Sequence, residues 1–384
     1  MAASVKIVNK SSTNSDKIFW ICFGKTVDGN AGIWSYLSFD SNGNASLNPF
    51  TVGQNCGPLF NTLDTLDMFK GLPEMWSGQF LFCLGKKPKV FNIVDNGNPA
   101  VNNGIGIQPP DFNPGAPDAK RKFCTVEFTN NTTLYINSTL VDQICAPISL
   151  SITNNNNSDV AKNGILKSGD NSATIFKGLK NLGNPWKKLV VTANVNGKKT
   201  DIRAIGPQHG VGAGLIPTNY YDTYINAIWK NYANTGANTL TINCPTKGTF
   251  VGQTNVTNNT FVFKQTGKSD VTISKPGPNL ASDIFGCVGT LNAPNNTDLG
   301  EVATILGAAL NRSIIKTSGS DTQPNCNASK FYSTANQAAN MYSKVMHDNY
   351  KSGIYAFPYD DVCTTNSPLL GVTNPKRITI TINK

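Results

Sequence analysis

Apolar and polar residues alternate through most of the first two hundred residues. Short runs rich in β-branched and aromatic residues recur there, and Asn, Gly, Ser and Asp separate them. Alternation of this kind predicts half-buried strands, and regular short strands with polar turns are typical of a sandwich or barrel. We therefore expect strands near residues 5–9, 17–23, 33–39, 79–84, 122–129, 133–142, 148–152 and 188–195.

The pattern changes near Gly206, where apolar residues begin to recur at helical spacing. Asp298 and Glu301 fit a capping box ahead of an apolar run, which predicts one helix there. A further helix is expected over roughly 333–349, and strands are expected at 239–243, 260–264 and 377–382. In the segment 220–235 one predicted helical face carries six apolar side chains, namely Tyr221, Tyr224, Ile225, Ile228, Trp229 and Tyr232.

These patterns predict a mainly β protein with an α/β part. We expect a β-sandwich or barrel domain over 1–205 and a mixed α/β domain over 206–384. The alternating strand at 377–382 can return to the first sheet, because an unpaired terminal strand would leave an exposed edge.

The composition is polar but carries few charges. Charged residues make up 15% of the chain, and the polarity comes from Asn, Thr, Ser and Gly. Such a surface suits neutral, hydroxyl-rich ligands such as sugars, although a compositional bias of the source genome gives the same pattern. The net charge of +10 first suggests nucleic acid. The lysines are scattered along the sequence without interleaved aromatic residues, so we interpret them as solvated surface and expect no nucleic-acid partner.

The nine cysteines show no CxxC spacing and the chain has two histidines, so no metal site is expected. Nine is odd, so at least one thiol is free or pairs between chains, and the pairing of any disulfides stays open. Neither an apolar leader segment nor a run of eighteen apolar residues is present, so no membrane span is expected. N-x-[ST] sequons recur, for example at Asn44, Asn137, Asn255 and Asn327.

Two carboxylates stand out because acidic residues are scarce. Glu127 lies in KFCTVEFT, where alternation puts it on one face with Thr129 and puts Val126 and Phe128 on the other. Asp142 ends the next predicted strand. Each acid alone is more simply a solvated surface group, but together they can supply the acid and base of glycoside hydrolysis. A tight hairpin would leave them on the order of 20 Å apart, so a bent connection is required.

Other titratable residues receive plainer interpretations. His209 lies in the glycine-rich segment GPQHGVGAG, which matches no phosphate-binding motif and is interpreted as a loop. His347 falls late in a predicted helix, where a helix-end or packing role is expected. Asp360 and Asp361 follow an aromatic run and are expected to anchor a turn.

The segment VEFTNNTTLYINSTLVDQICAPISL resembles the central motif of the glycoside hydrolase family 64 β-1,3-glucanases, the laminaripentaose-producing type. YYDTYINAIWKNY, LNRSIIK and the stretch from FYSTANQ to YAFPYDDV resemble later segments of that family in the same order. The resemblance therefore covers about residues 120 to 362. VKIVNKS at the start and YAFPYDD before the closing strand look like thaumatin-like proteins.

This resemblance implies an inverting endo-β-1,3-glucanase with Glu127 as general acid and Asp142 as general base. It implies that Thr129, Asn131 and Asn137 contact sugar. The implied fold is a thaumatin-like β-barrel and an α/β domain flanking a wide groove. The implied partner is β-1,3-glucan, with neither metal nor cofactor, and we expect a secreted monomer that binds neither nucleic acid nor membrane.

A different class of protein shares this resemblance. A non-catalytic glucan-binding or thaumatin-like defence protein would keep the groove and lack the reaction. The presence of both Glu127 and Asp142 favours the enzyme. Hydrolysis of a linear β-1,3-glucan distinguishes the two hypotheses.

Overall fold

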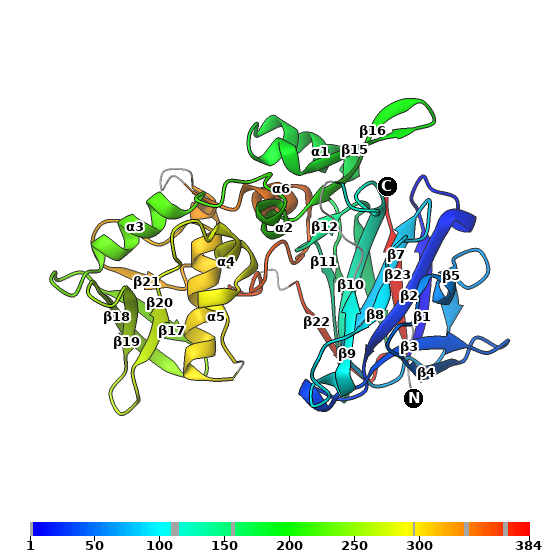
Figure 1. Cartoon of the computed structure of the whole chain (residues 1–384), viewed down its shortest axis with the longest axis horizontal. Coiled ribbons are helices and arrows are strands. Elements are labelled where there is room, and N and C mark those ends of the chain that lie inside the picture. The colour runs from blue at the N-terminus through cyan, green and yellow to red at the C-terminus, as the bar shows by residue number, and fades with distance from the viewer. Residues whose placement is uncertain (1–2, 109–114, 155–157, 295, 334–337, 364–367) are drawn as a thin grey trace.

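A computed structural model describes residues 3–108, 115–154, 158–294, 296–333, 338–363 and 368–384. A β-rich part, which contains both ends of the chain, lies beside a mixed α/β part built from the middle of the chain (Figure 1). The fold is thus mainly β with an α/β part, which confirms the fold class expected from the sequence.

The β-rich part is built from two packed sheets. The larger sheet has the strand order β22-β11-β10-β7-β2-β3-β4, with β5 paired to β2, and the smaller has the order β14-β13-β23-β1-β6. The larger sheet comprises β2 (Ile18–Lys25), β3 (Trp34–Phe39), β4 (Ala45–Pro49), β5 (Asn61–Thr62), β7 (Met75–Leu84), β10 (Lys122–Asn130), β11 (Thr133–Thr139) and β22 (Leu370–Thr373). The smaller comprises β1 (Ser4–Asn9), β6 (Met68–Phe69), β13 (Ile148–Thr153), β14 (Asp159–Asn163) and β23 (Arg377–Ile382).

The last strand of the chain, β23, lies inside the smaller sheet. It pairs in parallel with β1 and antiparallel with β13. Its alternate residues Ile378, Ile380 and Ile382 are fully buried against the larger sheet, in one cluster with Val126 and Phe128 of β10. Burial of each such side chain contributes about 1.5–3 kcal/mol, so the two ends of the chain are held together by their packing.

The outer face of the larger sheet carries a second apolar cluster. It joins Ile21, Leu81 and Phe123 of the sheet to Ile93 and Ile105. The last two residues belong to a small hairpin, β8 (Asn92–Asp95) and β9 (Ile105–Gln108), which covers part of this face. The outer face is therefore partly closed to solvent next to β10.

A three-stranded sheet and a helix follow the sandwich along the chain. The sheet has the order β12-β16-β15, made of β12 (Gln143–Ile144), β15 (Val190–Val195) and β16 (Lys198–Ile205). The helix α1 (Ser172–Asn181) lies in a region for which the sequence predicted only strands. Asn171 and Thr174 form a capping box there, and Ile175 and Leu179 are buried at helical spacing, so the local signal for this helix was present and was missed.

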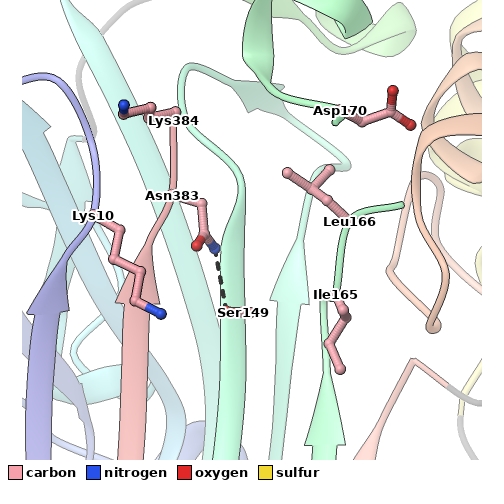
Figure 2. Close-up of a pocket in the computed structure, with 7 residues that line it drawn as sticks. All are labelled: Lys10, Ser149, Ile165, Leu166, Asp170, Asn383 and Lys384. Carbon is pink, nitrogen blue, oxygen red and sulfur yellow. Dashed lines mark hydrogen bonds between the residues drawn. The ribbon is translucent and has the colours of Figure 1, made fainter. Parts of the chain in front are cut away.

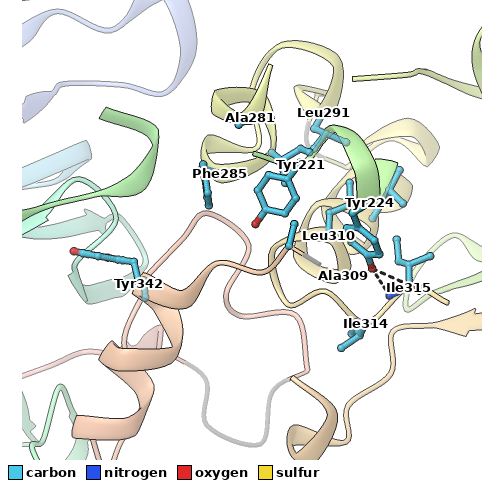
Figure 3. Packing of buried hydrophobic residues seen from close by; sticks show 14 of the residues in the cluster. Tyr221, Tyr224, Ala281, Phe285, Leu291, Ala309, Leu310, Ile314, Ile315 and Tyr342 are labelled. Carbon is cyan, nitrogen blue, oxygen red and sulfur yellow. Dashed lines mark hydrogen bonds between the residues drawn. The ribbon is translucent and has the colours of Figure 1, made fainter. Parts of the chain in front are cut away.

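The α/β part is organised around a five-stranded sheet of order β20-β19-β18-β17-β21. Its strands are β17 (Leu240–Cys244), β18 (Gly248–Asn255), β19 (Thr260–Lys264), β20 (Val271–Ser274) and β21 (Asp321–Gln323), and the helices are α2 (Pro207–Gly212), α3 (Asp222–Asn231), α4 (Ala281–Gly286), α5 (Asp298–Asn311) and α6 (Met341–Asn349). All six apolar residues of the predicted face on α3 are buried. The hydroxyl of Tyr224 accepts from the amide of Ile315 at 2.9 Å inside this core (Figure 3).

The start of α5 differs from the sequence prediction. The cap of α5 is Thr297, whose hydroxyl accepts from the amide of Gly300 at 2.9 Å, whereas Glu301 bonds the side chain of Thr246.

Cys326 and Cys363 form a disulfide. The other seven cysteines are buried free thiols.

Candidate active site

Glu127 lies on the outer face of the larger sheet. Its neighbours in register are Gln79 on β7 and Asn137 on β11. Val126 and Phe128 point into the sandwich core, whereas Glu127 and Thr129 are half-buried on the opposite face, as the alternation predicted. The carboxyl of Glu127 therefore projects from a rigid, paired strand.

The surroundings of Glu127 favour its protonated form. Burial raises the pKa of the Glu127 carboxyl to about 7, and the nearby charge of Asp142 adds to the rise. A hydrogen bond from the side chain of Asn137 opposes the rise, because it stabilises the carboxylate. Asn137 is 8% exposed, so its sequon is a poor acceptor for a glycan.

Asp142 approaches Glu127 because the chain bends after β11. Glu127 is opposite Asn137, five residues before Asp142, and a straight strand would carry Asp142 far away. The chain instead leaves the β10 ladder after Thr139, where the amide of Leu140 donates to the carbonyl of Tyr355 at 2.7 Å. It then enters β12, which pairs with β16. This is the bent connection that the spacing of the two acids required.

His209 contacts the second carboxylate. Its Nε2 lies 3.0 Å from Oδ1 of Asp142, and the side chain of Asp142 is 55% exposed. The two carboxyls thus have different environments, one enclosed and one open to solvent. The interpretation of His209 as a loop residue was wrong, because it lies in the short helix α2. Pro207 at the first turn of α2, after a strand, was the available signal for a helix start.

Gly206 holds the backbone of Asp142 in place. Its amide donates to the carbonyl of Asp142 at 2.6 Å, and it is the residue that precedes α2. A Cβ at this position would come within 1.9 Å of the carbonyl oxygen of Val141. Only glycine fits here, so one close contact fixes both the Asp142 segment and the helix that carries His209.

The other two predicted sugar-binding residues lie further along the β10–β11 hairpin. Thr129 is paired with Tyr135 in register and is half-buried. The side-chain oxygen of Asn131 accepts from the amide of Thr133 at 3.1 Å, so this side chain stabilises the hairpin turn. Asn131 lies four residues from Glu127, roughly 13 Å along the strand.

Tyr355 is a neighbour of Glu127 that the sequence did not single out. Burial raises the pKa of the Tyr355 hydroxyl above its ordinary value, and a hydrogen bond with Asp361 and the charge of Glu127 contribute to the rise. Asp360, the residue before Asp361, is buried and accepts a hydrogen bond from the amide of Ala356 at 2.9 Å. Its carboxylate also lies 2.9 Å from His347 and 3.1 Å from Arg312. The segment around Asp360 is therefore an anchored turn that presents Tyr355 beside Glu127.

A pocket of about 350 Å³ lies elsewhere, beside the end of β23 (Figure 2). Lys10, Asp170 and Lys384 are among its lining residues, and none of the predicted site residues is.

Within the described residues, no group of three or more His, Cys, Asp or Glu side chains is arranged to hold a metal ion. No helix in the described part of the chain is long and apolar enough to cross a membrane.

Comparison with known proteins bears on the whole chain. The family model described as Beta-1,3-glucanase, glycoside hydrolase family 64, matches residues 2–382. The chain belongs to this family. Two curated relatives, each named glucan endo-1,3-beta-glucosidase, come from Arthrobacter sp. (strain YCWD3) and Cellulosimicrobium cellulans. Each is 31% identical over 294 residues, which cover 76% of this chain and 49% of the relative. The chain thus spans about half the length of these relatives.

Two solved structures share the fold. A laminaripentaose-producing β-1,3-glucanase in complex with laminaritetraose aligns with a TM-score of 0.77 at 23% identity, covering 99% of this chain and 98% of that one. A β-1,3-glucanase domain of the same family from Clostridium beijerinckii aligns with a TM-score of 0.77 at 23% identity, covering 100% and 98%. The resemblance of the central motif to family 64 is thereby confirmed at the level of the family.

Proposed function

We propose that this protein is an inverting endo-β-1,3-glucanase in which Glu127 is the general acid and Asp142 the general base. The observation that carries the proposal is the raised pKa of Glu127, about 7, caused by burial and by the charge of Asp142. Two carboxyls in different environments are what acid–base hydrolysis of a glycoside requires. The family and the names of its curated relatives support β-1,3-glucan as the substrate.

Glu127 protonates the glycosidic oxygen as the bond to the leaving sugar breaks. A carboxyl with a pKa near 7 still holds its proton at neutral pH and is strong enough to transfer it. Once the proton has left, the side chain of Asn137 stabilises the carboxylate through its hydrogen bond. Gln79, paired on the other side of Glu127, completes a polar row across the three strands.

Asp142 removes a proton from water, which attacks the anomeric carbon from the opposite face. The carboxylate of Asp142 is open to solvent, so water can reach it. The proposal requires room for that water, and inverting enzymes provide it with carboxyls about 6.5–9.5 Å apart. His209, in contact with Oδ1, orients the carboxylate and leaves Oδ2 for the water.

Sugar contacts come from polar side chains around Glu127. We assign Thr129 and Asn137 to the sugars nearest the broken bond, since they lie on and beside β10. Asn131 would contact a sugar further along the chain with its amide nitrogen, because its oxygen is bonded to Thr133. The wide groove that would hold the glucan, and the division of the chain at residue 205, are part of the same proposal.

Product analysis on a linear glucan tests the reaction. The protein should release oligosaccharides from laminarin and curdlan, and early products should carry the α-anomer at the new reducing end, by ¹H NMR. Glu127→Gln and Asp142→Asn should each lower kcat by about 10²–10⁴ while glucan binding persists. Wild type that binds glucan without cleaving it would be the non-catalytic binding protein. An initial β-anomer, or a β-glycosyl azide formed by Glu127→Gln in azide, would exclude inversion.

We further propose that the protein acts outside the cell as a monomer. The Cys326–Cys363 disulfide supports an oxidising compartment. Fractionation of the producing cells and light scattering of the purified protein test the two statements. Recovery in the cytoplasm, or a stable dimer, would contradict them.

A further inference from the structure

Positive charge is concentrated in one stretch of the chain. Residues 171–200 contain six lysines and no acidic residue, so the stretch contributes +6 to a net charge of +10. The pairs Lys187-Lys188 and Lys198-Lys199 appear scattered along the sequence. In the structure they lie on elements that contact α1, which carries Lys177 and Lys180.

These lysines lie on one small packed unit. The helix α1, the 3-10 turn Trp186–Leu189 and the hairpin β15–β16 pack on one another around Ile175, Leu179 and Trp186. All six lysines are exposed on it. The hairpin projects outward from the molecule beside α1 (Figure 1). We call the exposed surface of these three elements the basic surface.

Few of these lysines form ion pairs with acidic residues of the protein. Lys180 pairs with Asp201 at 2.6 Å, and no ion pair links any of the other five to an acid in the described residues. Protection of a sheet edge can explain Lys198 and Lys199 alone, because β12 pairs with β16 only at Ala204 and Ile205 and leaves its outer side unpaired at these lysines. Lys177, Lys187 and Lys188 lie outside the sheet, on α1 and the 3-10 turn, so edge protection does not explain them. Five cations on one small unit without ionic partners repel one another, so an external anion would stabilise them.

We propose that the basic surface docks an anionic polysaccharide, one that carries carboxylates or phosphodiesters. The lysines supply the charge, and exposed amides interleaved with them can bond sugar hydroxyls, namely Asn181, Asn184, Asn194 and Asn196. The two aromatic residues of the unit, Phe176 and Trp186, are buried, so bases would find no stacking platform. Val195 is its one exposed large apolar side chain, too little for membrane insertion.

The basic surface is separate from the carboxylates and connected to them through β16. This strand is exposed at Lys198 and buried at Ile205, and the next residue, Gly206, bonds Asp142. Seven residues of strand span roughly 23 Å. A polymer on the basic surface would therefore hold the protein beside a matrix without entering the site of hydrolysis.

Affinity electrophoresis through gels of polygalacturonate, with neutral dextran as reference, tests the proposal. The Lys→Gln variant at positions 177, 187, 188, 198 and 199 should bind polygalacturonate at least about 10-fold more weakly than wild type in low salt, with a smaller salt dependence. The matched control changes five exposed lysines elsewhere and alters net charge equally, at Lys6, Lys10, Lys86, Lys89 and Lys230. It should keep wild-type affinity. Hydrolysis of soluble laminarin should be equal in all three proteins.

Four outcomes would overturn the proposal. The wild type could fail to bind polygalacturonate, or the two variants could lose affinity equally, which would reduce the effect to net charge. The wild type could bind a DNA duplex or vesicles containing anionic lipid more tightly than the polysaccharide. Failure of the proposed glucanase activity would leave this test intact, because the readout is binding to a polymer that contains no β-1,3-glucan.

Discussion

The charge of Asp142 acts on Glu127 across the bend that follows β11, and it raises the pKa of the Glu127 carboxyl beyond the effect of burial. As the proposed general acid, Glu127 must be protonated, so kcat/KM should fall as the pH rises through about 7. In Asp142→Asn the added rise disappears, and the pKa of Glu127 should fall while it stays above its ordinary value, because burial remains. NMR titration of the Glu127 carboxyl measures this in the inactive variant. An unchanged pKa would show that the two carboxyls do not interact.

Asn137 should have the opposite effect on the same group. Its hydrogen bond stabilises the Glu127 carboxylate, so Asn137→Ala should raise the pKa of Glu127 and move the alkaline limb of the kcat/KM profile to higher pH. The matched control is Asn131→Ala in the same hairpin, whose side chain bonds Thr133 instead. The control should leave the limb in place even if it raises KM. A limb that moves to lower pH in Asn137→Ala would contradict the assignment of this hydrogen bond.

His209 should act through Asp142 as a positioning residue. Removing its contact with Oδ1 in His209→Ala should lower kcat by roughly 10-fold or more with little change in KM, since the effect is on the proposed base. His209→Gln can still place a nitrogen donor near Oδ1 and should recover much of that loss. Both variants should keep the Tm of the wild type within a few degrees, because His209 is 38% exposed. If both variants kept the kcat of the wild type, the contact would be incidental to catalysis.

The periodicity of the sequence correctly predicted the strands and helices that bury only one of their faces. Glu127 and Thr129 lie on the outer face of β10 as alternation requires, and Tyr224 and Trp229 are buried on α3 as the helical spacing requires. These predictions depend on local sequence, and tertiary packing followed the same pattern. The helix α1 was missed because strand-like alternation dominates the flanking sequence and outweighs the local capping signal at Asn171.

The assembly of the candidate site could not be predicted in this way. Asp142 meets His209 and lies near Tyr342, whose hydroxyl donates to the carbonyl of Leu140 at 2.7 Å. These partners are 67 and 202 residues distant along the chain from the groups they contact. Such contacts depend on where the chain bends after Thr139, and periodicity does not encode a bend. The clustering of lysines on α1 and β16 was hidden for the same reason.

Gly206 offers a test of how strictly that bend is set. In Gly206→Ala the new Cβ would meet the carbonyl oxygen of Val141 at 1.9 Å and that of Asp142 at 2.9 Å, so backbone must move. Overpacking of this kind typically costs about 1–3 kcal/mol, and here the displaced residues carry the proposed base. We expect a lower Tm together with a loss of kcat that exceeds the loss in the fraction folded.

The matched control is Gly212→Ala in α2, where a Cβ would meet nothing within 4 Å. Alanine is favoured over glycine within a helix by about 1 kcal/mol, so the control should be unchanged or more stable, with normal kcat. If Gly206→Ala kept both the Tm and the kcat of the wild type, the contact between Gly206 and the Asp142 segment would not position the base.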